Sequence, residues 1–185
     1  MKKSSLIVLL ISIAIIVLAA CYLPTATASV QSKNTEIFFP RAGTDPAPIL
    51  ANLYSKSSLS IDCAIYSLTH PVIVQAMKDA HNKGIRVRVI TDKSQAAGKA
   101  QTAAINNLVQ IGVPVKISTH SGSMHLKMSI VDQRWLTTGS YNYSLAASNS
   151  NDEMFVVIDD SVLATGCLLE FNKIWATSEL AKMSY

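Results

Sequence analysis

The sequence predicts an α/β layer fold, because helical and strand patterns alternate along most of the chain. Apolar residues at three- and four-residue spacing predict helices over four ranges, namely Pro46 to Tyr54, Pro71 to Asn82, Ala96 to Ile111 and Ser161 to Trp175. Strands are expected near residues 35–39, 59–66, 85–91, 113–118, 126–132, 135–138 and 153–158. Alternating elements of this kind pack helices against a sheet.

Local signals support the boundaries of the second helix. Asn82-Lys83-Gly84 places a glycine where helices commonly end. The buried stripe of this helix is expected to contain its apolar residues, Val72, Val74, Ala76, Met77 and Ala80. Two readings remain for the alanine-rich segment 95–104, as a mobile lip of a groove or as an ordinary exposed helix start.

The first 29 residues have the pattern of a secretory signal. Two lysines precede an apolar run from Leu6 to Ala20, and small residues follow it. Ala26-Thr27-Ala28 suits cleavage to a soluble form, whereas Leu18-Ala19-Ala20-Cys21 is similar to a lipoprotein signal that would lipidate Cys21. A retained anchor is a third reading, although the run is shorter than the ~20 residues that span a bilayer. We expect a signal over residues 1–29, one domain over residues 30–185, and a periplasmic or secreted protein, with membrane attachment through the N-terminal segment as the alternative.

Net charge and cysteine content exclude few classes of function. The formal net charge of +4 includes two lysines of the signal, so no strongly basic surface is evident. Candidate phosphate contacts are Lys93, Lys99, Lys116 and Arg134. Cys63 and Cys167 lie in apolar patterns, which favours buried free thiols over a disulfide, and no ligand spacing typical of zinc occurs. His70 and His81 flank a predicted helix and are expected at the surface.

The residues most typical of chemistry begin at His125. Side chains alternate along a strand, so His125, Lys127 and Ser129 would share one face. Leu126, Met128 and Ile130 would lie on the opposite, apolar face. The run from Trp135 to Thr138 is typical of the returning strand of a hairpin, which would end in a turn at Gly139-Ser140.

This set is suited to attack on a phosphodiester. An imidazole such as His125 can attack phosphorus, and Lys127 can neutralise the non-bridging oxygens. Ser140 and Asn142 can donate hydrogen bonds to the charge that grows in the transition state. No metal or other cofactor is needed. Tyr141 and Tyr143 alternate with these ligands, which leaves base stacking, dimer contacts and core packing open for them.

His125-x-Lys127-x4-Asp132 followed by Gly139-Ser140-x-Asn142 resembles the signature of the phospholipase D superfamily. The resemblance implies a layered fold with a mixed β-sheet flanked by helices on both faces. It implies catalytic roles for His125, Lys127, Asp132 and Glu153, with Glu153 orienting the histidine, and phosphate binding by Lys127, Ser140 and Asn142. For Asp132, a structural role inside the site, holding the backbone or a neighbouring side chain by hydrogen bonds, is favoured over direct chemistry.

A single copy of the signature in 185 residues is similar to the small bacterial endonuclease branch. That resemblance implies a homodimer in which one His125 attacks and the other serves as general acid, then as base. The expected function is metal-independent cleavage of DNA, with RNA as a further substrate, through a phosphohistidine. The alternative is a lipid phosphodiesterase acting on phosphatidyl or cardiolipin head groups. A nuclease would have basic groove walls, whereas a lipid enzyme would expose an apolar rim.

Overall fold

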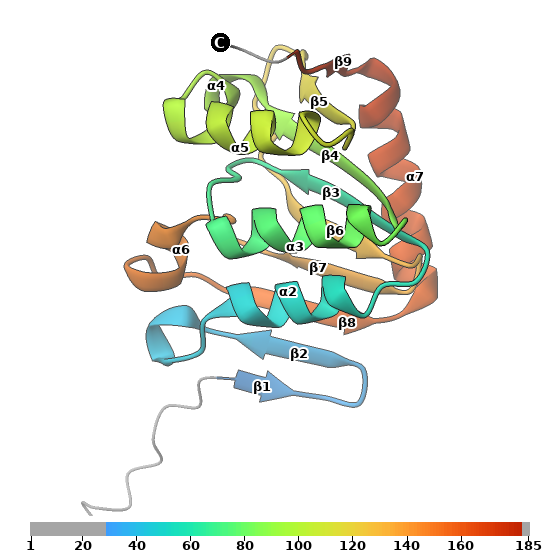
Figure 1. Cartoon of the computed structure of the whole chain (residues 1–185). Helices are drawn as coiled ribbons and strands as arrows, with labels where there is room; N and C mark the ends of the chain where they lie inside the picture. The colour runs from blue at the N-terminus through green and yellow to red at the C-terminus, as the bar shows by residue number, and fades with distance from the viewer. Residues whose placement is uncertain (1–28, 183–185) are drawn as a thin grey trace, which may run out of the picture.

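The computed structural model describes residues 29–182, in which nine strands form one mixed sheet (Figure 1). The strands are β1 Ser29–Gln31, β2 Thr35–Phe38, β3 Ser60–Ile65, β4 Arg86–Asp92, β5 Val115–Ser118, β6 Lys127–Val131, β7 Trp135–Gly139, β8 Phe155–Asp159 and β9 Glu179–Leu180. Their order across the sheet is β1-β2-β8-β7-β6-β3-β4-β5-β9. β4 runs parallel to β3 and β5, and the other pairs are antiparallel.

Helices cover both faces of the sheet, as the sequence analysis predicted (Figure 1). They are the 3-10 helix η1 Pro40–Ala42 and the α-helices α2 Pro46–Ser55, α3 Pro71–Asn82, α4 Lys93–Ala96, α5 Lys99–Val109, α6 Leu145–Asn149 and α7 Ser161–Thr177. α2, α3 and α5 lie on one face, and α7 lies on the other. The predicted α/β fold with a mixed sheet is therefore confirmed.

Each face of the sheet has its own apolar core, because strand side chains alternate between the two faces. Towards α2, α3 and α5, β3 contributes Ile61, Cys63 and Ile65. Towards α7, Ala64 packs near Ile130 and Phe171. Burying a side chain of this size contributes about 1.5–3 kcal/mol. The alternation predicted for β6 is confirmed, since Met128 and Ile130 face α7 while Ser129 bonds to Tyr54 of α2 on the opposite face.

Three expectations about helices and their ends are wrong. The helix predicted over 96–111 begins too early and ends too late, because Gly98 is the N-cap of α5, which ends at Val109, and Ala96 belongs to the separate helix α4. Val72 is 46% exposed, and Ile73 takes the inward position at the start of α3. His70 is buried rather than at the surface, with 4% of its area exposed, and its Nδ1 has no hydrogen-bond partner among the described residues.

The predicted signal lies outside the described residues, apart from Ser29 at the start of β1. Cys21 is among the residues left undescribed. Cys63 and Cys167 are free and pack on opposite faces of the sheet, which agrees with the expected absence of a disulfide. Within residues 29–182, no helix combines the length and apolar character needed to cross a bilayer.

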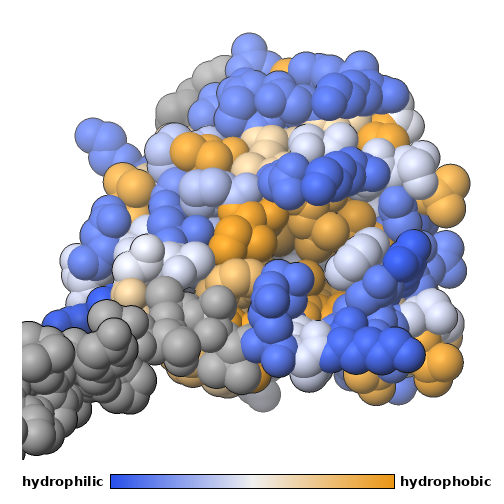
Figure 2. Space-filling model, turned by 90° about the horizontal axis from the view of Figure 1, so that it is seen from below, coloured by the Kyte–Doolittle hydropathy of each residue, from blue (hydrophilic) through white to orange (hydrophobic). Residues whose placement is uncertain are grey.

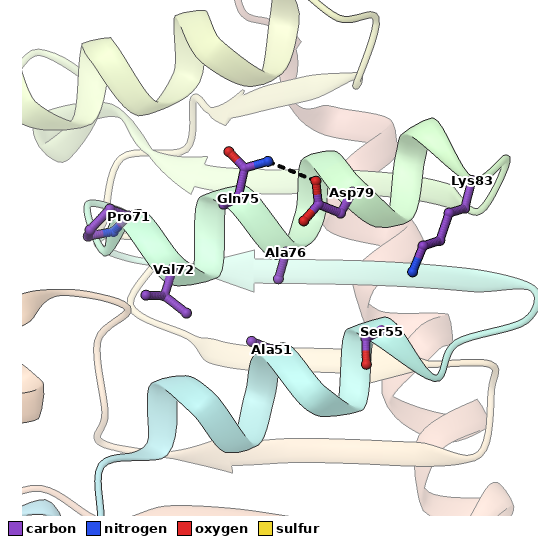
Figure 3. A pocket seen from close by; sticks show the side chains of 8 residues that line it. All are labelled: Ala51, Ser55, Pro71, Val72, Gln75, Ala76, Asp79 and Lys83. Atoms are coloured by element: carbon purple, nitrogen blue, oxygen red, sulfur yellow. Dashed lines mark hydrogen bonds between the residues drawn. The ribbon is translucent and has the colours of Figure 1, made fainter.

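The surface of the domain is mixed in character. Seen from the β1 edge, hydrophilic side chains surround an apolar area (Figure 2). A groove of about 590 Å³ runs between α2 and α3, and the side chains along it include Ala51, Ser55, Val72 and Ala76 (Figure 3). Its one drawn hydrogen bond joins Gln75 to Asp79 at 2.7 Å. None of the predicted site residues lines this groove.

Candidate active site

The strand register brings the signature residues to one end of the sheet. β6 is antiparallel to β3, and Lys127 pairs with Ile65, so β6 begins where β3 ends. β7 returns along β6, and Gly139 at its end pairs with Phe155 at the start of β8. Segments 125–127, 139–142 and 153–155 therefore meet although they are distant in sequence.

His125 and Lys127 share a neighbour, the ring of Tyr66. His125 is exposed, and its ring centroid lies 4.5 Å from that of Tyr66 with an angle of 61° between the planes. Lys127 is only 7% exposed; its Nζ lies 4.9 Å from the centre of the Tyr66 ring and donates to the His125 carbonyl oxygen at 2.9 Å. An ammonium carries three donors. Within the described chain, one of these donors is engaged by the His125 carbonyl oxygen, which leaves the others for phosphate oxygens.

Burial lowers the pKa of Lys127, and the nearby Glu153 carboxylate acts in the opposite direction. Desolvation penalises the ammonium form, whereas a negative charge favours it. Glu153 therefore helps to keep Lys127 charged at neutral pH.

Ser140 and Glu153 form a bonded pair across the β7–β8 end. The Ser140 hydroxyl donates to Glu153 Oε2, and the Met154 N–H donates to Ser140 Oγ at 3.1 Å. The second oxygen, Glu153 Oε1, accepts from the Asn151 amide at 3.1 Å. Among residues 29–182, the bonds of Glu153 go to these partners, and none joins it to His125 of the same protomer. The role of Glu153 as orienter of the histidine stays a prediction.

Gly139 makes this approach of the two strands feasible. Its φ is +129°, and a Cβ built on it would lie 2.0 Å from the Met154 carbonyl oxygen. The Ser140 N–H donates to that same oxygen at 3.0 Å. A glycine is therefore required for Ser140 to reach Glu153.

Asn142 is half-buried beside the loop that carries His70. Its Oδ1 is buried and has no hydrogen-bond partner within the described chain. The following carbonyl, of Tyr143, accepts from Thr69 and His70 N–H groups at 2.8 Å, which fixes the backbone there. An unsatisfied buried polar atom costs free energy. Oδ1 accepts hydrogen bonds, so a ligand that donates would satisfy it, whereas a phosphate oxygen would be bound by the amide NH2 of Asn142.

Asp132 lies at the other end of β6, away from His125. The strand between them is extended, so Asp132 and Lys127 are about 17 Å apart. Its carboxylate accepts the N–H groups of Ser58 (2.8 Å), Leu59 (2.8 Å) and Ser60 (2.9 Å). The structure shows support through hydrogen bonds, outside the catalytic group, and does not place Asp132 where it could act on substrate.

The basic residues offered as phosphate contacts are mostly engaged elsewhere. Arg134 forms a double hydrogen bond with Asp159 at the Asp132 end of the sheet. Lys116 donates to the Trp175 carbonyl oxygen at 2.6 Å, and Lys93 donates to that of His120 at 2.8 Å. Lys99 is exposed at the start of α5.

Tyr141 and Tyr143 are core residues with no exposed area. The Tyr143 hydroxyl lies 2.7 Å from Ser129 Oγ, and the Tyr141 hydroxyl lies 2.7 Å from Ser148 Oγ. Of the three roles left open for them, core packing is the one that the structure supports. Base stacking would need an exposed ring.

Sequence reasoning missed Tyr66. It follows the last residue of β3, and its N–H donates to the Leu126 carbonyl oxygen at 2.8 Å, next to His125. An aromatic residue at the end of a buried strand was the available signal. The strand pairing that brings it to His125 was not readable from the sequence.

A shallow hollow of about 630 Å³ adjoins the site. Its lining includes Ser140 and Glu153 together with Phe39, Arg41 and Met154. Two apolar side chains beside the predicted site residues are partly exposed, Leu126 at 38% and Met154 at 40%. Arg41 is paired with Asp152 at 3.3 Å. The described rim is thus more apolar than basic.

A His-x-Lys pair at the start of β6 and a Gly-Ser turn after β7, on this mixed sheet, define a phospholipase D-like α/β protein. The family model described as "cardiolipin synthase, PLD-like domain" matches residues 50–175. The chain therefore belongs to the phospholipase D superfamily.

Two curated relatives and one solved structure illustrate the match. The chain is 31% identical to the mitochondrial cardiolipin hydrolase of Xenopus tropicalis, over 72% of this chain and 62% of that protein. It is 30% identical to a phospholipase D of Rickettsia conorii, over 75% of this chain and 67% of that protein. Nuc from Salmonella typhimurium, a phospholipase D family member, matches with a TM-score of 0.76 and 27% identity over 80% of this chain and 97% of Nuc. The chain spans between about half and two thirds of the cardiolipin hydrolases that it matches.

Proposed function

We propose that this protein hydrolyses phosphodiesters, and that it is a non-specific endonuclease acting on DNA, with RNA as a further substrate. The observation that carries the proposal is the grouping of an exposed imidazole, a buried ammonium and a serine hydroxyl at one end of β6. The imidazole is a nucleophile for phosphorus, and the ammonium suits a phosphate's oxygens. The Ser140 hydroxyl donates to Glu153 in the structure, so it would turn its one O–H from that carboxylate to a phosphate oxygen.

In the proposed mechanism, His125 attacks phosphorus, so that an N–P bond forms while the P–O bond to the leaving oxygen breaks. Lys127 neutralises the non-bridging oxygens, with Ser140 and Asn142 as further ligands. The leaving oxygen needs a proton, and the signature supplies one histidine per chain. We propose that the partner's His125 in a homodimer donates that proton. It then deprotonates the water that breaks the N–P bond and releases the phosphate.

The match to Nuc supports the endonuclease reading. It extends over 97% of Nuc, whereas the curated cardiolipin hydrolases extend well beyond the matched region. The signature itself resembles the small bacterial endonuclease branch. The site residues suit a substrate that is held by its phosphates. Contacts to the phosphate backbone of a nucleic acid carry no sequence information, so cleavage without sequence preference is expected.

A lipid phosphodiesterase is the second candidate, and one structural observation favours it. Leu126 and Met154 are 38% and 40% exposed near His125 and Glu153, and Arg41 in the adjoining hollow is paired with Asp152. An exposed apolar rim suits a lipid surface. The same surface would also suit the interface of the proposed homodimer. The names of the curated relatives, cardiolipin hydrolase and phospholipase D, agree with lipid chemistry.

Parallel digestion separates the two candidates. Purified protein is incubated with plasmid DNA, with RNA and with cardiolipin vesicles, each in EDTA, and His125→Ala is compared with His120→Ala. His120 is an exposed histidine of the same loop. DNA cleavage that survives EDTA and is lost only in His125→Ala supports the nuclease. Lipid turnover alone would replace it by the second candidate, and cleavage abolished by EDTA would exclude the metal-independent mechanism.

We also propose that the N-terminal segment directs export to the periplasm or the medium. The support is the charged start, apolar run and small residues in sequence. Mass spectrometry of protein recovered from cell fractions tests this. A chain starting at Ser29 indicates a cleaved soluble form, a lipidated Cys21 indicates an anchored form, and an intact chain in the cytoplasm contradicts the proposal.

A further inference from the structure

We propose that Tyr66 is a positioning residue that holds His125 and Lys127 in the arrangement needed for attack on phosphorus. We propose also that the buried Asp92 carboxylate fixes the segments that hold Tyr66 and His125 in place. The proposal rests on the phosphodiesterase function proposed above. It concerns residues outside the signature, from the ends of the parallel strands β3 and β4.

Tyr66 contacts both reacting side chains through one ring. Its centroid lies 4.5 Å from that of His125 in an edge-on arrangement, within the range where aromatic pairs attract. The Lys127 ammonium lies 4.9 Å from the same centroid, within the distance of a cation–π contact. One rigid side chain therefore limits the movement of the nucleophile and of the cation together.

Both backbone groups of Tyr66, its N–H and its carbonyl oxygen, are hydrogen-bonded. Its N–H donates to the Leu126 carbonyl oxygen at 2.8 Å, which ties it to the residue between His125 and Lys127. Its carbonyl oxygen accepts from the Gln101 amide at 3.2 Å and from the Thr91 hydroxyl at 3.3 Å. Gln101 is 2% exposed, so its hydrogen bond to the Tyr66 carbonyl oxygen is shielded from water.

Asp92 connects the same ring to the loop that carries His125. Its carboxylate is 1% exposed, and Oδ2 accepts from the Met124 N–H at 2.9 Å, one residue before His125. Oδ1 caps α4 by accepting from the Ser94 and Gln95 N–H groups at 2.8 and 3.3 Å. The side-chain amide of Gln95 donates to the Tyr66 hydroxyl at 3.0 Å. A single buried carboxylate thus fixes the loop, the short helix and, through Gln95, the ring.

Positioning of this kind matters because attack on phosphorus requires the imidazole in line with the leaving oxygen. A displacement of about 1 Å at a reacting group can cost about 100-fold in rate. Tyr66 makes no covalent contribution in this account. Its removal should lower the rate of the chemical step and leave substrate binding largely intact.

The test compares Tyr66→Leu, Tyr66→Phe and Asp92→Asn with the matched control Asp160→Asn. Asp160 caps α7 with the same pattern of two N–H bonds, from Val162 at 2.8 Å and Leu163 at 3.0 Å, and does not touch the site. kcat and KM are measured on bis(p-nitrophenyl) phosphate at a temperature where thermal melts show every variant folded. We expect kcat of Tyr66→Leu to fall about 30- to 100-fold with KM within about threefold. Tyr66→Phe should lose at most about fivefold, Asp92→Asn about tenfold, and Asp160→Asn less than twofold.

A second readout does not depend on activity. The ring current of Tyr66 shifts the side-chain protons of His125 in a 1H–13C spectrum, and this shift should vanish in Tyr66→Leu, persist in Tyr66→Phe and change in Asp92→Asn. A folded Tyr66→Leu with kcat near wild type, or with a raised KM and unchanged kcat, overturns the positioning role. If the wild-type protein cleaves no phosphodiester, the proposed function fails, and the His125 shifts alone decide whether Tyr66 holds the ring.

Discussion

Replacing Asp132 by asparagine separates a structural role of this signature residue from a catalytic one. Asn keeps the size of the side chain and tolerates the left-handed backbone found here, where φ is +54°. One carboxylate oxygen accepts from Leu59 and Ser60, and the other accepts from the N–H and hydroxyl of Ser58. In Asn the second oxygen becomes an NH2 group. This NH2 group faces the Ser58 N–H, so that two hydrogen-bond donors oppose each other.

The loss of stability in Asp132→Asn follows from this single lost acceptor. The Ser58 hydroxyl can rotate to accept a hydrogen bond from the new NH2 group. The backbone N–H of Ser58, just before β3, is left without its acceptor. A hydrogen bond to a charged group contributes about 1.5–3 kcal/mol. For a domain of this size, 1 kcal/mol corresponds to a shift of about 2–4 °C in the melting temperature, so Tm should fall by about 3–12 °C.

Thermal unfolding and steady-state kinetics together test this prediction. The matched control is Asp79→Asn, an exposed carboxylate bonded to Gln75, whose stability should stay within about 0.5 kcal/mol of wild type. At 20 °C, where Asp132→Asn is folded, kcat should lie within about twofold of wild type, because Asp132 is about 17 Å from Lys127. A folded Asp132→Asn as inactive as His125→Ala would refute the reasoning.

Four further outcomes are expected. Gly139→Ala should abolish activity and lower the yield of folded protein, measured by circular dichroism, because its Cβ would meet the Met154 carbonyl oxygen at 2.0 Å. Ser129→Ala should lower the free energy of unfolding in urea by about 1–3 kcal/mol, since the buried hydroxyl lies 2.6 Å from that of Tyr54 and 2.7 Å from that of Tyr143; an unchanged midpoint would contradict this. Burial alone would raise the pKa of Asp92 and Asp132, but their hydrogen bonds outweigh it and hold both below the ordinary value. Their contribution to stability is therefore present above pH ~4 and lost as pH falls through the lower folded values, and acid titration of Asp132→Asn should show a weaker loss below pH ~4 than wild type. Burial raises the pKa of Cys63 to about 12, so iodoacetamide at pH 8 should leave this thiol unmodified until the protein is unfolded.

Local patterns predicted most of the sheet and its helices. The alternation in β6, the glycine that ends β7 and the glycine after α3 could each be predicted from a few residues, because each depends on neighbours in sequence. The break at Gly98 and the burial of His70 were missed for different reasons. Gly98 was visible in the alanine-rich segment 95–104. Burial of His70, by contrast, depends on how α2 packs against α3 and on the distant segment at Tyr143, whose carbonyl oxygen accepts the His70 N–H.

The site was predictable where one strand and its hairpin carried it. His125, Lys127 and Ser140 could be grouped because a hairpin returns the chain to its start. The predicted strand over 126–132 already implied about 20 Å between its ends, and hence a distant Asp132. Tyr66 and Asp92 reach the site through the pairing of β3 with β6 and β4, and pairing between strands distant in sequence is not encoded in any local pattern.

The margins of the sheet have a consequence for the behaviour of the protein at high concentration. The two outermost strands, β1 and β9, are the shortest, with three and two residues. The longer strands between them are paired on both sides. Within residues 29–182, a neighbouring molecule that approached in solution would find only a few unpaired backbone groups on these two outermost strands, too few to template the addition of a strand. This protects the apolar strands of the interior from joining into fibrils, and directs any association between copies to side-chain surfaces.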